Sequence, residues 1–389
     1  MYDAMVIGAR CAGAATAMLL ARGGARVLML DRARFPSDTV STHFLHPAGV
    51  ARLDAWGLLP ELLDTGCPPV ERMTFDFGEV VVSGAPYPVG GTSLALAPRR
   101  TVLDNLLVRA AVDAGVEFRP GASVRAVTER DGRVTGVEFA SAGRVFTESG
   151  RLVIGADGRH SSLARLVGAE TYRDLGLISC WYYGYWSGLP DKVGRVFVRD
   201  GRFVAAFPTH QGRHCVAAGW PRDQFPVVKR DPEAALMSLL AELPPEFHEG
   251  VMGGRRDGRL VGAGDLANHY RRSAGPGWAL VGDAGLVRDP ACAHGMTSAF
   301  TQADALARYV IAALGEGAAA LDAATAAYVR ERDETTWDAF LANAAFAACA
   351  PSTEFLKTLH AARTDPERVT EFLGVYAGAV PGTAFFGLN

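Results

Sequence analysis

A glycine-rich turn near the start of the chain has the residue types of a phosphate-binding site. It runs from Gly8 to Gly13 with the sequence Gly-Ala-Arg-Cys-Ala-Gly. The apolar residues 4–7 before it are typical of a buried parallel strand, and residues 14–20 are typical of a helix. The first turn of such a helix presents free backbone N–H groups and the positive end of the helix dipole. We therefore expect this turn to hold the diphosphate of a dinucleotide.

An acidic residue follows the next expected strand at the distance that nucleotide recognition requires. Residues 26–30 form that strand, which ends at Asp31, 23 residues after Gly8. In dinucleotide-binding folds, an acidic side chain at about this separation accepts hydrogen bonds from the ribose hydroxyls. Asp31 thus favours an adenosine with a free 2′-hydroxyl, as in FAD or NAD, over NADP at this site.

The turn departs from the usual fingerprint because Arg10 occupies the position of the second glycine. That glycine normally lets the backbone approach the diphosphate closely. Either the Arg10 side chain turns away, or its guanidinium adds positive charge to the phosphates. We expect the site to tolerate this residue, with Arg10 near the diphosphate.

Length and composition limit the class of protein. The chain has 389 residues, 49% of them hydrophobic, which indicates a globular protein with one large core or two to three smaller ones. A net charge of -3 gives no reason to expect nucleic acid as a partner. The six cysteines are scattered without metal-ligand spacing, which favours a cytoplasmic location and no metal. No apolar run approaches the ~20 residues of a membrane span.

Two further apolar strands lead into turns that carry glycine and aspartate. Residues 152–154 precede Gly155-Ala156-Asp157-Gly158, and residues 278–281 precede Gly282-Asp283-Ala284. A carboxylate at the carboxyl end of a strand lies at the crevice where open α/β sheets bind ligands. After the second of these turns, we expect a long helix over residues 295–314.

The other segments indicate a mixed architecture. Helices are expected over residues 47–56 and 101–114, a hairpin turn at Asp131-Gly132, antiparallel strands over 178–186, 193–198, 203–207 and 214–220, and further helices towards the end, with the surroundings of Arg332 in solvent. The dinucleotide-binding part is thus expected to be assembled from separated pieces of an α/β chain.

Taken together, these motifs resemble the class A flavoprotein monooxygenases, the para-hydroxybenzoate hydroxylase-like group that also includes geranylgeranyl reductases and flavin halogenases. The resemblance spans essentially the whole chain. It implies an α/β fold with a Rossmann-like FAD-binding domain of the GR2 type, an antiparallel-sheet substrate domain and a C-terminal helical segment. The boundaries that we expect are 1-72, 97-172 and 264-315 for the FAD-binding domain, 73-96 and 173-263 for the substrate domain, and 316-389 for the helical region.

The resemblance also implies roles for individual residues towards a tightly but non-covalently bound FAD. Asp157-Gly158 is implied to lie near the diphosphate and to serve both FAD and NAD(P)H, Asp283 to hold the ribityl hydroxyls, and Arg100 to reach the cofactor from the start of a helix. The helix that follows Pro290 is implied to point its N-terminus at the flavin pyrimidine, where its dipole would stabilise the reduced ring. The expected FAD contacts are Gly8, Arg10, Cys11, Ala12, Gly13, Asp31, Arg32, Arg100, Val124, Asp157, Gly158, Asp283, Pro290, Gly295 and Met296.

Candidates for the reacting end are His43, Tyr183 and His294. The segment that holds His43 is implied to lie beside the flavin, where this histidine either donates a hydrogen bond in the pocket or serves packing alone. His294 and Cys292 invite a nucleophile and base interpretation, but residues two apart in a loop rarely face each other, so backbone contact to flavin is the expected role. Alternation along a strand puts Trp181, Tyr183 and Tyr185 on one face and Tyr182 and Trp186 on the other, without deciding which face lines the pocket.

The reaction that the resemblance favours is monooxygenation of a small aromatic or polyene natural-product substrate by O2 through a C4a-hydroperoxyflavin. The electron donor would be NADPH or NADH, bound without a Rossmann domain of its own because no second glycine-rich unit is present, or else a partner flavin reductase. Alternatives are alkene reduction of the geranylgeranyl reductase type and a flavoprotein whose FAD shapes a cyclisation pocket without redox chemistry. Halogenation is disfavoured because the family's halogenases are implied to need a lysine soon after the glycine turn, whereas the first lysine here is Lys192.

Overall fold

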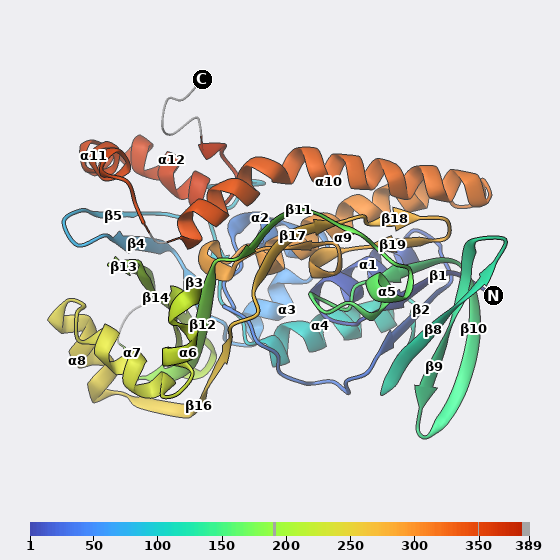
Figure 1. Ribbon diagram of the computed structural model, residues 1–389, viewed down its shortest axis with the longest axis horizontal. Coiled ribbons are helices and arrows are strands. Elements are labelled where there is room, and N and C mark those ends of the chain that lie inside the picture. The colour runs from blue at the N-terminus through green and yellow to red at the C-terminus, as the bar shows by residue number, and fades with distance from the viewer. Residues whose placement is uncertain (190–191, 349, 383–389) are drawn as a thin grey trace.

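The computed structural model describes residues 1–189, 192–348 and 350–382. Two sheets lie towards opposite ends of the molecule, and the long helix α10 (Ala318–Ala347) runs along one side of it (Figure 1). The α/β class, the antiparallel sheet and the C-terminal helices predicted from the sequence are confirmed. The predicted domain boundaries stay a prediction.

The first sheet is built on parallel strands. Its central order is β18-β19-β10-β1-β2-β7, and β1 (Tyr2–Ile7) pairs in parallel with both β10 (Arg144–Gly155) and β2 (Val27–Asp31). The flanking strands are β19 (Trp278–Leu280), β18 (Ala274–Gly275) and β7 (Glu117–Pro120). Ile7 lies opposite Gly155 and Leu30, and Gly155 lies opposite Leu280, so the parallel strands β1, β2, β10 and β19 end at one edge. Each glycine or aspartate turn noted above follows one of these ends.

Alternation along these strands explains why helices cover one face of the sheet. Val6 and Ile154 point towards α1 (Cys11–Arg22), α4 (Arg100–Asp113) and α9 (Gly295–Ala312), and their neighbours Met5 and Val153 point the other way. On the opposite face lie α5 (Ser162–Leu166) and the hairpin of β8 (Ala122–Arg130) and β9 (Arg133–Ser141). Asp131 and Gly132 turn this hairpin with φ of 52° and 73°, as the sequence predicts.

The second sheet has seven strands in the order β16-β12-β15-β14-β13-β4-β5. All its pairs are antiparallel except that of β13 with β4. The strands are β12 (Ser179–Ser187), β13 (Val193–Arg199), β14 (Arg202–Thr209), β15 (Arg213–Pro221), β16 (Arg255–Ala263), β4 (Arg72–Asp76) and β5 (Val81–Gly84). The four strands predicted between residues 178 and 220 are thus confirmed, and the predicted alternation of aromatics along β12 holds.

The two faces of this sheet meet different surroundings. Trp181, Tyr183 and Tyr185 pack with Phe44 and with residues of the C-terminal helices, whereas Tyr182 and Trp186 pack with α7 (Pro232–Leu240) and α8 (Pro245–Gly253). The face that carries Tyr183 is therefore the one turned towards the first sheet's segment around Phe44. The tertiary structure decides a choice that the sequence leaves open.

The remaining elements connect the two parts. They are α2 (Pro47–Ala55), α3 (Leu59–Asp64), β3 (Pro69–Val70), β6 (Ala95–Leu96), α6 (Phe225–Val228), α11 (Thr353–Ala362), α12 (Pro366–Tyr376), the small sheet of β11 (Thr171–Leu177), β17 (Ala267–Arg271) and β20 (Leu286–Val287), and the 3₁₀ turns His210–Gly212, Arg222–Gln224, Gly282–Ala284 and Pro290–Cys292. None of the helices within the described ranges is long and apolar enough to cross a bilayer.

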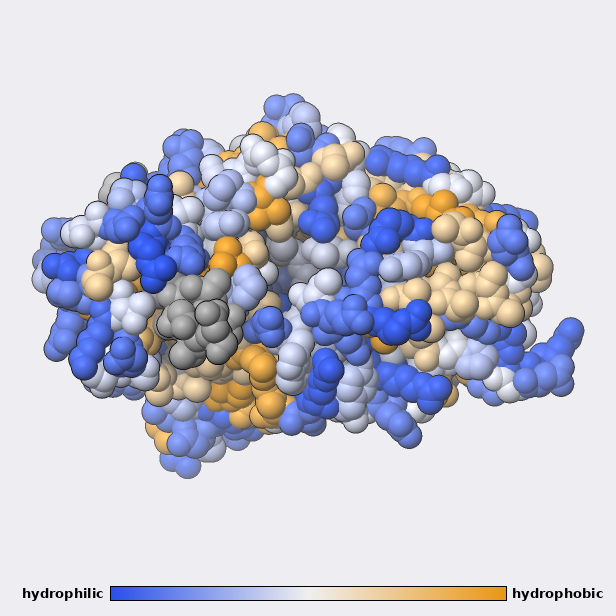
Figure 2. Space-filling model, turned by 90° about the horizontal axis from the view of Figure 1, so that it is seen from above, coloured by the Kyte–Doolittle hydropathy of each residue, from blue (hydrophilic) through white to orange (hydrophobic). Residues whose placement is uncertain are grey.

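Helix α10 is fixed to the small sheet by a buried arginine, which corrects one expectation. Arg332 is only 3% exposed, whereas the sequence led us to expect its surroundings in solvent. Its guanidinium donates to Ser273, to the Tyr172 hydroxyl at 2.9 Å and to the Asp333 carboxylate at 2.6 Å. Arg332 alone is buried among its charged neighbours, since Arg330 and Glu334 are exposed, and hydrophilic side chains cover much of the surface seen from the side of α10 (Figure 2).

Candidate functional site

The first glycine turn has no room for side chains at two positions. A Cβ atom at Gly8 would overlap the carbonyl oxygen of Ala156, and one at Gly13 would overlap the carbonyl oxygen of Gly8. Gly8 also has a φ of 102°, which only glycine adopts readily. The turn therefore packs directly on the second glycine motif, and the two glycines are needed for that close approach.

The third motif, Gly282-Asp283-Ala284, packs against the first glycine turn as well. A Cβ atom at Gly282 would lie 2.8 Å from the Cβ of Ala12, and Gly282 has a φ of 62°. The Gly282 N–H donates to the side chain of Gln302 on α9 at 3.0 Å. Three segments separated by more than a hundred residues each thus meet in a single site at the carboxyl edge of the sheet.

Two helix N-termini at this edge offer unsatisfied backbone donors. Neither α1, which begins at Cys11, nor α9, which begins at Gly295, has a side-chain cap or an acid in its first turn. Gly295 is exposed, and no atom lies within 4 Å of where its Cβ would be, whereas Met296 is buried. Open space in front of free N–H groups is what a negatively charged cofactor atom needs.

The Arg10 side chain is engaged within the protein. Its guanidinium donates to the Asp104 carboxylate at 2.7 Å, to the Ser37 hydroxyl at 3.0 Å and to the carbonyl oxygen of Asp38 at 3.0 Å. The side chain is still 25% exposed. Arg10 thus ties the turn to the segment that leads to His43, and its expected position near the diphosphate stays a prediction.

The adenosine end of the site has the expected acid. Asp31 is 9% exposed, and its carboxylate accepts the backbone N–H groups of Ala9 and Ala33, both at 2.7 Å. Two oxygen atoms with two lone pairs each leave acceptor capacity for ribose hydroxyls. Arg32 is exposed and Val124 is half-buried on β8. All three are compatible with contacts to an adenosine.

The Asp157 carboxylate accepts hydrogen bonds within the protein at the start of α5. It accepts from the Ser161 hydroxyl at 2.5 Å, from the Ser162 hydroxyl at 2.5 Å and from the Ser162 N–H at 2.7 Å. Gly158, with a φ of 81°, then turns the chain with open space around it. Contact of this pair with FAD or NAD(P)H stays a prediction.

The late aspartate, Asp283, combines access to solvent with close protein surroundings. Asp283 is accessible to solvent, yet the surrounding protein atoms withdraw enough water to raise the pKa of its carboxyl, against the opposing charges of Arg100, Arg159 and Arg288. A carboxylate there can accept from the hydroxyls of a ribityl chain.

Arg100 is held by a partner that the sequence reasoning missed. It is 8% exposed, and it donates from Nε and Nη2 to the Asp104 carboxylate at 3.1 and 3.0 Å. Burial lowers the pKa of Arg100, but the charge and hydrogen bonds of Asp104, together with Cys11 and Asp283, raise it by more in total, so the guanidinium stays charged. The spacing of four residues within an expected helix is a signal that could have found this pair.

The loop before α9 shows why the nucleophile and base interpretation fails for Cys292 and His294. Arg288 donates to the Nδ1 atom of His294 at 3.4 Å, so Nε2 carries the proton and donates to the carbonyl oxygen of Tyr376 at 2.7 Å. Burial lowers the pKa of His294 well below its ordinary value and raises the pKa of the Cys292 thiol. His294 thus joins the loop after Pro290 to the end of α12, and the thiol is not activated.

His43 meets Tyr183 and Tyr185 on the inner face of the second sheet. The Tyr185 hydroxyl lies 2.5 Å from His43 Nε2, and the Tyr183 hydroxyl donates to the carbonyl oxygen of Thr39 at 3.4 Å. His43 is fully buried with a φ of 61°, a strained conformation for histidine, and burial lowers its pKa to about 3. No acceptor meets hydrogen-bond geometry at its Nδ1 atom, although the Pro98 carbonyl is close enough to favour the charged ring slightly.

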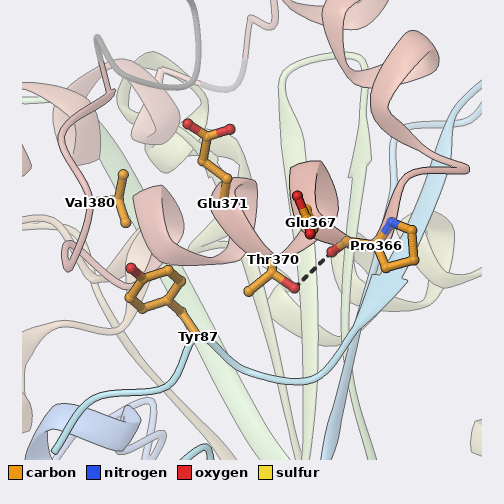
Figure 3. Close-up of a pocket in the computed structure, with 6 residues that line it drawn as sticks. All are labelled: Tyr87, Pro366, Glu367, Thr370, Glu371 and Val380. Carbon is orange, nitrogen blue, oxygen red and sulfur yellow. Dashed lines mark hydrogen bonds between the residues drawn. The ribbon is translucent and has the colours of Figure 1, made fainter.

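Two cavities lie outside these clusters. One, of about 300 Å³, is lined by Arg159, His160, Ser161, Ala164, Arg165, Ala169 and Arg271 and adjoins the Asp157 turn. The other, of about 440 Å³, lies between Tyr87 and α12, with Glu367, Thr370 and Glu371 on its helical wall (Figure 3). Only the first adjoins a residue predicted to bind the cofactor. In the described ranges, no group of three His, Cys, Asp or Glu side chains could hold a metal ion.

The donor set fits FAD. The N-termini of α1 and α9 carry backbone N–H groups without a side-chain cap, and the carboxylates of Asp31 and Asp283 could accept hydrogen bonds from sugar hydroxyls. The glycine turn leaves no volume for side chains where a diphosphate must approach the backbone. Asp104, Gln302 and Arg288 complete the site, and none of these three residues was predicted from the sequence.

Comparisons with known proteins agree with this chemistry. Residues 1–224 match a family model described as an FAD binding domain. The chain is 27% identical to 6-methylpretetramide 4-monooxygenase of Streptomyces rimosus over 317 residues, which are 77% of this chain and 73% of that protein. It is 30% identical to menaquinone reductase of Mycolicibacterium smegmatis over 311 residues, 76% of this chain and 72% of that one.

The fold is also shared with solved flavoenzymes. The structure of the flavin-dependent brominase Bmp2 superimposes with a TM-score of 0.86 at 16% identity, covering 100% of this chain and 96% of that chain. At this identity the similarity establishes the fold alone. The match over residues 1–224 and the converging glycine and aspartate motifs lead to one conclusion: the chain belongs to the FAD-binding-domain family and is an FAD-dependent oxidoreductase.

Proposed function

We propose that this protein is a monooxygenase that hydroxylates or epoxidises a small aromatic or polyene substrate. The observation that carries the proposal is the junction between the two sheets. Segment 38–46 leads from the carboxyl edge of the first sheet to the aromatic face of β12, where His43 contacts Tyr185. When bound, FAD supplies the redox chemistry, transferring electrons from a donor to O2.

The residues of the first sheet would hold the cofactor. Asp31 would accept the ribose hydroxyls, the N-terminus of α1 would face the diphosphate, and Asp283 would accept the ribityl hydroxyls. The N-terminus of α9 at Gly295 would face the pyrimidine edge and stabilise the negative charge of a reduced ring. Each group assigned to FAD here still has hydrogen-bonding capacity that its contacts within the protein do not use.

The second sheet would form the substrate chamber. Trp181, Tyr183 and Tyr185 belong to a buried cluster that includes Phe203 and Phe207. An aromatic wall binds a flat apolar substrate and excludes water from the reacting atoms. His43, held neutral by burial, can donate or accept one hydrogen bond at a substrate oxygen.

A nicotinamide donor is supported by the basic cavity beside Asp157. Arg159, Arg165 and Arg271 line it together with His160 and Ser161, and Asp265 is the carboxylate that pairs with Arg159 at 3.1 Å. Guanidinium groups of this kind bind phosphates. We therefore propose that NADPH or NADH reduces the flavin directly, with a partner flavin reductase as the alternative source of electrons.

Reduction of a substrate double bond is the second candidate. The similarity to menaquinone reductase at 30% identity favours it, while the similarity to 6-methylpretetramide 4-monooxygenase favours monooxygenation. Dependence on O2 separates the two. Monooxygenation predicts that NADPH oxidation with trial substrates yields an oxygen-containing product under air and no product without O2, whereas unchanged yield without O2 would overturn it in favour of reduction.

The assignment of Asp283 has its own test. We expect Asp283→Ala to lose bound FAD on purification, with an affinity at least ~10-fold lower, because a hydrogen-bonded carboxylate is removed. Asp54→Ala, an exposed substitution on α2, is the matched control and should stay yellow. A stably yellow Asp283→Ala protein would contradict the role.

A further inference from the structure

Arg99 carries a positive charge beside the aromatic face of β12, and its only ion pair within the described residues is a long one to an exposed side chain. Its guanidinium carbon lies 3.6 Å from the centroid of the Tyr185 ring, and its side chain is 19% exposed. The Nε atom is buried with no hydrogen-bond partner. The nearest carboxylate oxygen, on Asp38, is 3.9 Å away, at the outer limit of an ion pair, on a side chain that is 45% exposed.

The neighbouring residue, Arg100, has a guanidinium that is paired with a buried carboxylate. Arg100 donates three hydrogen bonds to the buried carboxylate of Asp104. The guanidinium carbon of Arg99 instead lies over the aromatic ring of Tyr185. Stacking leaves the N–H edges of the planar guanidinium free, and such a fork matches a carboxylate with two parallel hydrogen bonds.

The surrounding contacts hold Arg99 in place. The Arg99 backbone N–H donates to His210 Nδ1 at 3.2 Å, and His210 Nε2 in turn donates to the Thr65 hydroxyl at 2.8 Å. The ring beneath the guanidinium is fixed because the Tyr185 hydroxyl bonds His43. A cation that is held in place and mostly withdrawn from water, with only a distant and exposed carboxylate beside it, favours the binding of a closer anion.

We propose that Arg99 binds a carboxylate group of the substrate, so that the substrate class is a carboxylic acid with an aromatic or conjugated body. The carboxylate would displace Asp38 from the edge of the guanidinium, and the body would lie along the face of Tyr183 and Tyr185. The inference rests on the proposed function in taking this face as the wall of the substrate chamber.

The test uses benzoate and its neutral isostere benzamide as probes of the FAD-loaded protein. Binding is measured by the change in flavin absorbance and by calorimetry, without turnover. We expect the natural protein to bind benzoate at least ~10-fold more tightly than benzamide, and Arg99→Gln to lose this preference. Arg99→Lys should retain part of it, since the charge stays but the planar fork is lost.

Two further variants act as opposite controls. Asp38→Asn should raise the affinity for benzoate because it removes the competing carboxylate, and Arg230→Gln, which removes an exposed charge from the far side of the substrate sheet, should change nothing. FAD content and thermal midpoint are recorded for each variant. If Arg99→Gln does not fold, the benzoate preferences of Arg99→Lys and Asp38→Asn test the proposal. Equal affinity for the two probes, or a preference unaffected by Arg99 substitutions, would overturn the proposal.

The outcome is independent of the reaction type. If the benzoate preference follows Arg99 while O2 is not needed for product formation, only the proposed monooxygenation fails. If oxygenation is observed but benzoate and benzamide bind alike, only the carboxylate site fails.

Discussion

Asp104 joins two arginines and a cysteine that come from different parts of the chain. It is fully buried and accepts from Arg10 at 2.7 Å, from Arg100 at 3.0 Å and from the Cys11 thiol at 3.3 Å. A buried carboxylate between two guanidinium groups is stable because each charge has hydrogen-bonded partners. The residue that replaces the second glycine of the turn thus has a structural partner in α4.

Gly8 is the residue at which sterics alone should decide cofactor binding. Gly8→Ala places a Cβ atom against Ala156 at a φ of 102°, so we expect the free energy of unfolding to fall by about 2–4 kcal/mol and bound FAD to be lost. Urea unfolding and visible absorbance measure the two effects. Gly57→Ala is the matched control, since Gly57 has a φ of 76° but no atom within 4 Å, and it should cost only about 1 kcal/mol and keep FAD. Equal loss of FAD in both variants would contradict the close-contact explanation.

Asp289 should make stability depend on pH. Burial raises the pKa of this carboxyl to about 6, against the hydrogen bonds from Ser179 and from the backbone of Ala291. The folded state therefore holds the proton more tightly than the unfolded state, whose pKa is near 3.8, and the group's contribution to stability falls as pH rises from about 4 to about 6.

The variant Asp289→Asn removes this titration. We expect its stability relative to the natural protein to rise by up to about 3 kcal/mol between pH 4 and pH 7. The measurement is urea unfolding of both proteins at several pH values. A constant difference across this range would show that Asp289 does not titrate there.

At the scale of elements, helices α9 and α10 hold the turn at Gly282 in place through hydrogen bonds. Gln302 on α9 accepts from the Gly282 N–H at 3.0 Å and from the Tyr328 hydroxyl on α10 at 3.1 Å. The Tyr328 hydroxyl also lies 3.2 Å from the carbonyl oxygen of Leu280. The turn that carries Asp283 is thereby fixed by two helices that lie outside the sheet.

The anchoring of α10 should depend on one buried arginine. Arg332→Met leaves the partly buried Asp333 and the Tyr172 hydroxyl without their cation, so we expect the free energy of unfolding to fall by about 3 kcal/mol. Arg330→Met, an exposed change on the same helix, should stay within about 0.5 kcal/mol of the natural protein. Thermal or urea unfolding measures both, and a similar effect of the two changes would argue against the anchor.

At the scale of the whole molecule, the cofactor site is assembled from the ends of four strands that are far apart in the chain. A ligand that bridges them stabilises the folded state by mass action, about 2.7 kcal/mol at a hundredfold excess over Kd. We expect FAD added to the apoprotein to raise the Tm by about 3 °C.

FMN provides the control for this prediction, because it has the isoalloxazine ring but no adenosine for Asp31 and no second phosphate for the turn at Gly8. Its effect on the Tm should be much smaller than that of FAD at equal concentration. Equal stabilisation by FMN would mean that the adenosine half of the site contributes nothing.

Features that depend on neighbours in sequence could be predicted from the sequence. The strand before Gly8, the helix after it and the hairpin turn at Asp131 follow from local periodicity and turn residues, and the structure contains each of them. The meeting of the three glycine motifs could also be expected, because parallel strands end at one edge. The prediction for Arg332 was wrong, since a charged residue is buried only where distant partners satisfy it.

By itself, the sequence predicted a dinucleotide turn and an acid for the ribose, because steric demands on glycine and the alternation of apolar residues act between neighbours in the chain. Its resemblance to the flavoprotein monooxygenases predicted the FAD-binding fold, which the structure contains. Only the tertiary structure decided which aromatic face turns inward, that Asp157 caps α5, and that Arg99 is left without a matched anion while Arg100 has one. These outcomes depend on hydrogen bonds and charges between residues far apart in the chain, and such pairings exist only after the elements have packed.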